Sequence, residues 1–444
     1  MIAIGGYQMT EMQRAYESLP VAASAEVVVV GAGPAGLCAA VAAAEEGAET
    51  LLVERYGFMG GMATSALVNP FMRYMSGDEV VNAGIFARIL AKLDQRGARG
   101  GTDAERRAFD PQVLKIVCDE LVAEAGVRVL LHTFLVDAVA SRGRVRRGIV
   151  SSKSGLQAVV GELFVDASGD ADLAARAGAE FEMGRPEDGL CQPMTLYFRM
   201  AGVDEARLPS YEEITEMYLE EKAAGRIDNP RDDVHRIIHT THPGEVTFNT
   251  TRVLGHDATN AASMTEVEII ARRQVEQLVR FLRQRVAGFE DAYLCAIAAQ
   301  TGVRESRRVL GDYALSGDDV TIARKFTDGV ARGCFSIDIH NPTGHGIYAK
   351  PVPAGDAYDI PYRCLTPRGF ENLLVAGRPI SADHYAHGSL RVMPIAASTG
   401  EAAGVAAAMC VGQGKTTREV DVSRLRERLK QRGASIYEAE DVAG

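Results

Sequence analysis

A short apolar run followed at once by a glycine turn and an alanine-rich stretch most limits what this chain can fold into. Val27–Val30 is β-branched and uncharged, which predicts a buried strand. Residues 31–36 read Gly-Ala-Gly-Pro-Ala-Gly, and the next stretch, from Leu37 to about Glu46, predicts a helix that Gly47 ends. A strand, a glycine turn and a helix in this order open a βαβ unit of an α/β domain.

Each glycine of the turn has a physical task. Gly31 makes the turn, Gly33 lets the backbone approach a pyrophosphate, and Gly36 allows the helix to pack closely on the strand. The anion then lies on the amide groups and the positive dipole end of the helix. A second predicted strand, Glu49–Val53, ends at Glu54, which lies 54 − 31 = 23 positions beyond the first glycine. A carboxylate there accepts hydrogen bonds from an adenosine ribose and repels a 2′-phosphate, which predicts FAD or NAD and not NADP.

A glycine pair directly after this acid favours the flavin. Gly60 and Gly61 lie within the segment Arg55–Thr64. In NAD dehydrogenases the chain normally continues into another βα unit. In flavoproteins of the glutathione-reductase-like superfamily, which this segment resembles, the chain crosses under the flavin, and a glycine pair lets it pass the diphosphate.

Further stretches resemble the bacterial FAD-dependent oxidoreductase family over about residues 24–412, in collinear order. They are Val303–Tyr313, Ser336–His340, Ile360–Leu365, and the run from Asn372–Arg378 through Gly388–Pro394. The substrates of that family are mostly unassigned. The resemblance therefore implies a cofactor and a fold, but no particular reaction.

The implied fold class is α/β, a Rossmann-like, glutathione-reductase-like FAD-binding domain with an inserted α+β substrate domain built on a β-sheet. We expect an arm at 1–25, a discontinuous FAD domain at 26–190 and 354–435, an insert at 191–353 and a tail at 436–444. Within the insert, Met194–Met200 and Glu245–Leu254 predict strands. Tyr211–Ala224, Thr265 to about Val286, and Ala292–Gln300 predict helices.

Contacts to FAD are expected from several separate segments. By superfamily analogy, a strand at 134–139 supplies backbone contacts to the adenine, and the turn after residues 163–166 is a second nucleotide motif. Arg378 is expected at the pyrophosphate, and the helix Pro394–Met409 points its positive end at the flavin. The expected contact residues are Gly31, Gly33, Pro34, Ala35, Gly36, Glu54, Arg55, Gly60, Gly61, Met62, Leu135, Val136, Ala167, Ser168, Gly169, Gly377, Arg378, Ala397 and Ser398.

Histidine is the default group for proton removal beside a flavin, because its pKa lies near neutral pH. His340 lies in a polar loop, where catalytic groups tend to occur, although it could equally hydrogen-bond the loop backbone. His384 follows the last flavin strand. Arg391 could clamp a substrate carboxylate or balance an anionic flavin. We therefore predict His340 or His384 as the base, with Arg391 orienting the substrate.

Other polar clusters receive structural interpretations. His235 and His239 are spaced i, i+4, but a solvent-facing helix is favoured over a metal pair. Arg304, Arg307 and Arg308 surround Glu305, and at least part of this cluster is predicted to be an ion network that bridges domains. The seven cysteines are scattered without Cys-x-x-Cys spacing, so no metal site is expected.

Composition favours a cytoplasmic enzyme. The net charge is −11 and the basic residues are dispersed, which argues against nucleic-acid binding. The first 25 residues lack a signal-peptide pattern, and no run is expected to be long enough to span a bilayer, so no membrane contact is predicted. Apolar residues in the arm leave a homodimer possible.

The sequence thus predicts an FAD-dependent dehydrogenase or oxidase that transfers a hydride from a small polar substrate to flavin N5. An NAD(P)H-fed reductase or monooxygenase is an alternative, and the lack of a second Gly-x-Gly-x-x-Gly unit counts against it. A second alternative is a non-catalytic or RNA-directed flavoprotein, and the negative net charge of the chain counts against it. The substrate, the electron acceptor and a covalent flavin link remain open.

Overall fold

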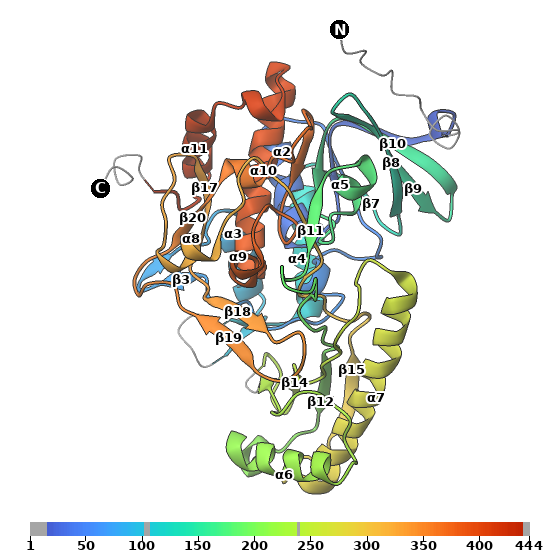
Figure 1. Cartoon of the computed structure of the whole chain (residues 1–444), viewed down its shortest axis with the longest axis vertical. Coiled ribbons are helices and arrows are strands. Elements are labelled where there is room, and N and C mark those ends of the chain that lie inside the picture. Colours follow the sequence, from blue (N-terminus) through green and yellow to red (C-terminus); the bar gives the residue numbers. More distant parts are fainter. Residues whose placement is uncertain (1–15, 102–106, 238–239, 438–444) are drawn as a thin grey trace.

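A seven-stranded sheet forms the centre of the computed structural model, which describes residues 16–101, 107–237 and 240–437 (Figure 1). Its order is β7-β2-β1-β10-β9-β8, with β21 paired to β10 beside this path. Pairs among β7, β2, β1, β10 and β21 are parallel, whereas β8 and β9 add an antiparallel hairpin. The strands are β1 (Val21–Val30), β2 (Thr50–Val53), β7 (Arg128–Leu130), β8 (Phe134–Ser141), β9 (Arg144–Ser152), β10 (Gly155–Asp166) and β21 (Leu373–Val375).

Small residues allow two helices to pack closely beside this sheet. Helix α2 (Pro34–Glu45) lies against α10 (Met393–Gln413). A Cβ added at Gly400 would lie 2.0 Å from the Ala35 carbonyl oxygen, and one added at Gly404 would lie 2.2 Å from the Ala39 carbonyl oxygen. The predicted Rossmann-like α/β architecture is present, and its core includes this close contact between helices.

Helix α10 corrects the expectation that no run is long enough to cross a membrane. Its 21 residues are long and apolar enough by length and composition. However, 83% of its most apolar 18-residue window is buried inside the protein. The apolar character of α10 is explained by its place in the core.

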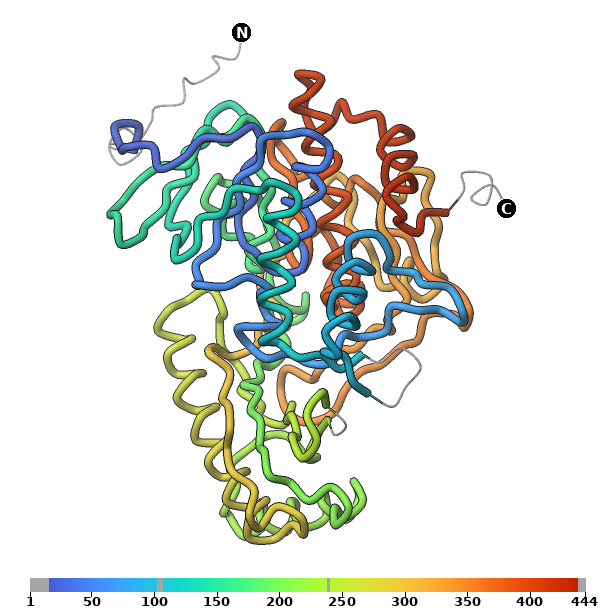
Figure 2. Tube along the Cα trace, turned by 180° about the vertical axis from the view of Figure 1, so that it is seen from behind, coloured from blue at the N-terminus to red at the C-terminus, as the bar shows by residue number. Residues whose placement is uncertain are grey.

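A second sheet with its own core forms the lower part of the molecule in Figures 1 and 2. Its antiparallel order is β13-β14-β12-β15, and the long helix α7 packs with it. The Phe198 and Phe248 rings stack in this core with centroids 4.6 Å apart. The elements are β12 (Phe198–Ala201), α6 (Tyr211–Ala223), β13 (Arg236–Ile237), β14 (Val246–Phe248), α7 (Ala261–Arg285) and β15 (Tyr293–Ile297).

The prediction of a helix at Ala292–Gln300 is wrong, because this segment contains strand β15 at the edge of the second sheet. Residues 21–25, assigned to the arm, instead extend β1, and Val21 pairs with Ala158 of β10. In both places, pairing with a distant strand decided the conformation. Residues 1–15 of the arm and residues 438–444 of the tail lie outside the described residues.

The insert ends earlier than predicted. Residues 194–303 contribute to the second core, whereas Val309, Phe326 and Ile339 belong to the core of the first domain. The boundary expected at 353 therefore lies near 303. Segments after it contribute to the core of the first domain.

The remaining elements connect and cover the two sheets. Helices α3 and α4 pack on each other on the face seen in Figure 2. The helices are α3 (Ile85–Asp94), α4 (Pro111–Glu124), α5 (Asp172–Ala177), α8 (Gly317–Thr321), α9 (His384–Leu390) and α11 (Val422–Gln431). The short strands are β3 (Met75–Ser76), β4 (Glu79–Val80), β5 (Arg99–Gly100), β6 (Ala108–Phe109), β11 (Phe181–Met183), β16 (Arg307–Val309), β17 (Gly329–Gly333), β18 (Ile337–His340), β19 (Ile347–Lys350) and β20 (Tyr358–Pro361).

Candidate active site

A narrow groove and a larger cavity meet at the carboxyl ends of the central strands. The groove has a volume of about 100 Å³ and the cavity about 690 Å³. Four residues line both: Met62, Arg378, Arg391 and Met393. Ligands of open α/β sheets bind outside the carboxyl ends of the strands, so the groove occupies the expected position for a nucleotide.

The groove is a cradle from which side chains are excluded. A Cβ at Gly61 would lie 2.5 Å from the Gly33 Cα atom, so the two backbones approach each other closely. Gly31 has φ +92°, and a Cβ there would lie 2.5 Å from the Ala167 carbonyl oxygen. A Cβ at Gly36 would lie 1.7 Å from the Gly31 carbonyl oxygen. The first two observations shape the groove, while Gly36 serves the packing of helix on strand.

Glu54 is held rigidly beside this cradle. The backbone N–H of Ala32 donates to its Oε2 at 2.7 Å, and that of Tyr56 donates to its Oε1 at 3.0 Å. The side chain is buried and lines the groove. It holds a fixed negative charge where the sequence predicts the ribose hydroxyls.

Arg378 fits an anionic group at the junction of groove and cavity. Its Nη2 donates to Asp170 Oδ1 at 2.9 Å. Its Nη1 is buried and has no hydrogen-bond partner among the described residues. A guanidinium with an open donor in the wall of a nucleotide groove is suited to a pyrophosphate oxygen.

Most of the predicted nucleotide contacts line the groove, and six do not. Those that line it are Gly31, Gly33, Pro34, Ala35, Glu54, Arg55, Gly61, Met62, Ala167, Ser168, Gly169, Gly377 and Arg378. Gly36, Gly60, Leu135, Val136, Ala397 and Ser398 are absent from its wall. From α10, Met393 and Ala396 line the groove instead, whereas Ser398 accepts a hydrogen bond from Asn82 at 3.0 Å. The face of α10 that meets the groove was therefore mispredicted.

The cavity wall is strongly basic. One acidic residue, Asp338, lines it together with six arginines: Arg107, Arg231, Arg236, Arg304, Arg378 and Arg391. Val68, Met72 and Phe335 contribute apolar surface. The space therefore combines a cationic region with an apolar region.

His340 lies in this wall, but its contacts make it a poor base. Arg252 Nη2 lies 2.9 Å from its Nδ1, and since arginine only donates, that nitrogen accepts. Its Nε2 is 3.6 Å from Asp338 Oδ2. Burial and the charge of Arg304 lower the pKa of His340 to about 3, although Asp338 opposes this shift. His340 is thus neutral near pH 7 and carries its proton on Nε2.

Arg391 also lines the cavity, and the carboxylate of Asp338 balances its charge. Its Nη2 donates to both the carbonyl oxygen and Oδ2 of Asp338, at 3.0 and 3.1 Å. Burial alone would raise the pKa of Asp338. The neighbouring His340 and the charge of Arg391 instead hold that pKa well below its usual value. Asp338 and Arg391 form an ion pair in the wall.

His384 does not line the groove or the cavity, which corrects its prediction as a base. Its Nδ1 lies 2.8 Å from Oε1 of Glu305, whose carboxylate also accepts from Arg308 at 2.6 Å. All three side chains are buried. His384 follows the last flavin strand, as predicted, but it belongs to an ion network with Glu305 and Arg308 that does not line the cavity.

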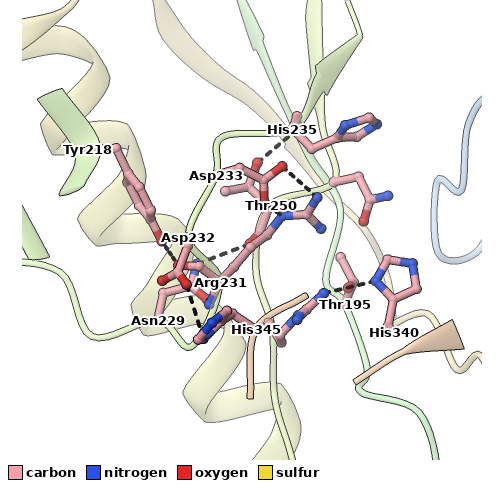
Figure 3. Close-up of polar contacts among 12 residues, drawn as sticks. Thr195, Tyr218, Asn229, Arg231, Asp232, Asp233, His235, Thr250, His340 and His345 are labelled. Atoms are coloured by element: carbon pink, nitrogen blue, oxygen red, sulfur yellow. Dashed lines mark hydrogen bonds and ion pairs between the residues drawn. The ribbon is translucent and has the colours of Figure 1, made fainter. Parts of the chain in front are cut away.

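His235 was assigned to a solvent-facing helix, and this assignment is wrong. The residue directly precedes β13 and lines the cavity. Its ring makes no hydrogen bond to a described residue, whereas its backbone carbonyl accepts from Thr250 at 2.8 Å (Figure 3). Burial, followed by the charge of Arg231, lowers the pKa of His235. His239 lies outside the described residues.

The arginine cluster around Glu305 divides into two parts. Arg307 pairs with Asp172 at 3.1 Å and Arg308 pairs with Glu305 at 2.6 Å, as expected of an ion network. Arg304 points away from this network into the cavity wall. No group of three or more His, Cys, Asp or Glu side chains within the described ranges is placed to hold a metal ion.

Comparison with known proteins identifies a family that matches most of the chain. The model of the family described as FAD dependent oxidoreductase matches residues 26–429. The digeranylgeranylglycerophospholipid reductase of Methanothrix thermoacetophila is 28% identical over 208 residues, which are 44% of this chain and 46% of that protein. The thiamine thiazole synthase of Aeropyrum pernix is 32% identical over 179 residues, 37% of this chain and 62% of that protein.

The chain spans about half the length of the first of these relatives. Among solved structures, a geranylgeranyl bacteriochlorophyll reductase-like protein from Thermoplasma acidophilum superposes with a TM-score of 0.48 at 14% identity. The superposition covers 92% of this chain and 84% of that one.

Proposed function

The chain belongs to the FAD dependent oxidoreductase family, and from that premise we propose that it transfers a hydride from a small polar substrate in the cavity to N5 of FAD in the groove. FAD is the cofactor of the family. The side-chain-free cradle of Gly33 and Gly61, the fixed Glu54 carboxylate and the open donor of Arg378 fit it. When bound, FAD supplies the two-electron acceptor.

The single observation that supports this proposal most is the junction of the two spaces. Met62, Arg378, Arg391 and Met393 line both the groove and the cavity. A molecule in the cavity therefore lies directly beside whatever occupies the groove. A substrate that fills the cavity would displace water from this junction.

We assign the proton acceptor to His235 in place of His340 or His384. Its ring has no protein partner among the described residues, and its lowered pKa keeps it neutral near pH 7. A ring nitrogen of His235 can therefore take the proton from a substrate hydroxyl or amine. The Nδ1 atom of His340 is occupied by Arg252, so His340 acts as a donor through Nε2.

The first experiment is an anaerobic titration of the purified holoenzyme with hydroxy acids, amines and sugars, followed by the flavin absorbance. Bleaching by one panel member supports the proposed direction of electron flow and gives the substrate class. Acid precipitation then separates dissociable from covalent FAD. If the protein cannot be reconstituted with FAD, or no organic donor bleaches it, the proposal fails.

His235→Gln tests the assignment of the base, with His384→Gln as the control outside the cavity. We expect His235→Gln to lower kcat by at least about a hundredfold, the size of a general-base contribution. His384→Gln is expected to lower stability without removing turnover. Loss of kcat on His384→Gln with retained folding, and none on His235→Gln, would reverse the assignment.

Reduction is a second candidate, favoured because the matching relatives from methanogens are named reductases. In that direction an external donor reduces FAD, and the substrate in the cavity is then reduced. Stopped-flow mixing with NADH or NADPH distinguishes the two directions. Rapid bleaching by a nicotinamide nucleotide, with none by the organic panel, favours the reductase.

A further inference from the structure

The arginines of the cavity differ in how their charge is matched. Arg391 pairs with Asp338, and Arg378 pairs with Asp170. Arg231 forks against Asp233, with contacts of 2.5 and 2.9 Å (Figure 3). Arg304 has no carboxylate partner among the described residues. An uncompensated guanidinium in a cavity wall is unfavourable unless an anion joins it there.

Arg304 is fixed in position by neutral oxygens. Its Nη1 donates to the Pro193 carbonyl oxygen at 2.7 Å and to Thr195 Oγ1 at 2.8 Å. Its Nη2 donates to Asn249 Oδ1 at 3.2 Å. These bonds orient the guanidinium but leave its charge unbalanced. The residue thus has the preorganised geometry of a binding group.

The surroundings of Arg304 add to this imbalance. Burial and the nearby charges of Arg391 and Arg231 lower the pKa of Arg304 to about 9. Repulsion among these side chains opposes the charged form. An anion within the cavity would reverse the effect, because it replaces repulsion with attraction.

Two other arginines of the cavity wall have buried N–H donors without an acceptor, which is a second observation that points to an anionic ligand. Arg231 is 5% exposed, and its Nη1 is buried without a partner among the described residues. Nε and Nη1 of Arg236 are likewise buried and unpartnered. Both residues line the same cavity as Arg304. A buried cationic donor without an acceptor destabilises the folded protein. An oxygen of a bound ligand would accept this hydrogen bond and remove the cost.

We propose that the cavity is specific for substrates with an anionic oxygen group, a carboxylate or a phosphate, which binds at Arg304 with donors from Arg231. This inference rests on the proposed function of the cavity and names its substrate class. The prediction of Arg391 as the clamp changes accordingly, because Asp338 already neutralises Arg391. The apolar wall at Val68, Met72 and Phe335 accommodates the body of such a substrate.

The test is calorimetric binding of matched probes to the holoenzyme. Benzoate and benzamide share a shape and differ in charge, and phenyl phosphate supplies the phosphate arm. We expect benzoate or phenyl phosphate to bind at least about tenfold more tightly than benzamide, and the tighter of the two identifies the group. Equal or weaker binding of both anions would overturn the proposal.

Variants locate the site. Arg304→Gln is expected to weaken binding of the preferred anion by at least about tenfold while leaving benzamide binding unchanged. Arg304→Lys, which keeps the charge without the planar fork, should fall between the two. Arg207→Gln is the matched control, because Arg207 is exposed and paired with Glu290 at 2.7 Å. An equal loss in the control, or none in Arg304→Gln, contradicts the assignment.

These outcomes remain separate from those of the proposed function. Calorimetry requires no turnover, so preferential anion binding without flavin bleaching supports the subsite and counts against the hydride donor. If Arg304→Gln does not fold, Arg231→Gln takes its place, with the same expected loss of anion binding. Unchanged anion binding in a folded Arg231→Gln would then overturn the proposal.

Discussion

At the scale of single residues, His340 and His235 show how neighbours decide the chemistry of the same side chain. Both line the cavity. His340 is held between Arg252 and Asp338, which fixes its proton on Nε2. The His235 ring makes no hydrogen bond to a described residue and keeps an available nitrogen. His340, which was predicted in a loop and instead ends strand β18, is therefore the poorer base.

A pH profile checks this difference. A base must be neutral to accept a proton. Because the pKa of His235 is lowered from its usual value, the fall of kcat on the acid side should come at a lower pH than for an ordinary histidine. The pKa of His340 is about 3. We expect His340→Gln to lower kcat/KM by about tenfold, equivalent to one lost hydrogen bond, and to keep the acid limb. Loss of that limb in His340→Gln would mean that His340 is the base.

At the scale of elements, the α2–α10 contact is limited by volume. Gly404→Ala would place a methyl group 2.2 Å from the Ala39 carbonyl oxygen. We expect it to lower the free energy of unfolding by about 1–3 kcal/mol or more, because the helices must separate. Thermal denaturation followed by circular dichroism measures the change.

The same helix offers a matched control for this substitution. A Cβ at Gly412 would meet nothing within 4 Å. Gly412→Ala should therefore raise stability by up to about 1 kcal/mol through helix propensity. Equal effects of the two substitutions would show that the close contact between α2 and α10 has no energetic importance.

The pair β17–β20 contains a carboxylate whose ionisation opposes folding. Burial raises the pKa of Asp359 to about 6, although the Phe326 N–H donates to it at 3.0 Å. The folded state therefore binds a proton more tightly than the unfolded chain. The contribution of protonated Asp359 to the free energy of unfolding is fully present below about pH 4. It is lost as the pH rises through about 6.

Asp359→Asn should remove this pH dependence. Two pKa units correspond to about 3 kcal/mol, so the wild type should lose up to that amount relative to the variant between about pH 4 and pH 7. Denaturant unfolding of both proteins at several pH values measures the difference. A difference that stays constant over this range would contradict the raised pKa.

At the scale of the whole molecule, FAD links the segments that make up the groove. Its wall combines residues from 31–65, 167–169, 300 and 376–396. Removal of FAD should therefore lower Tm, since a ligand at a hundredfold excess over its Kd stabilises the folded state by about 2.7 kcal/mol. Differential scanning calorimetry of holo and apo protein tests this. An unchanged Tm would indicate that FAD contacts few of these segments.

The burial of α10 in the core predicts that this helix does not insert into a membrane. The apolar surface of the helix is already used against α2 and the sheet. We expect the protein to remain in the supernatant after ultracentrifugation of a cell lysate, without detergent. Recovery with the membrane pellet would contradict this expectation.

Much of the groove was predictable because its determinants lie close together in the chain. Gly31, Gly33 and Glu54 belong to one βαβ unit, where short-range sterics require glycine and a fixed acid. The helical face of α10 was not predictable to the same degree. Small residues occur on every face of α10, so the sequence pattern does not indicate whether Ala396 or Ala397 meets the groove.

The sequence by itself determined the nucleotide cradle and the parallel strands beneath it, because both depend on local spacing and on buried apolar runs, and its motifs resembled the family. Only the tertiary structure decided which polar side chains keep a hydrogen-bond donor or acceptor without a protein partner. Arg252 lies 88 positions before His340, and Glu305 lies 79 positions before His384. Whether a histidine is a base, or an arginine binds a substrate, depends on partners that long-range folding brings to it.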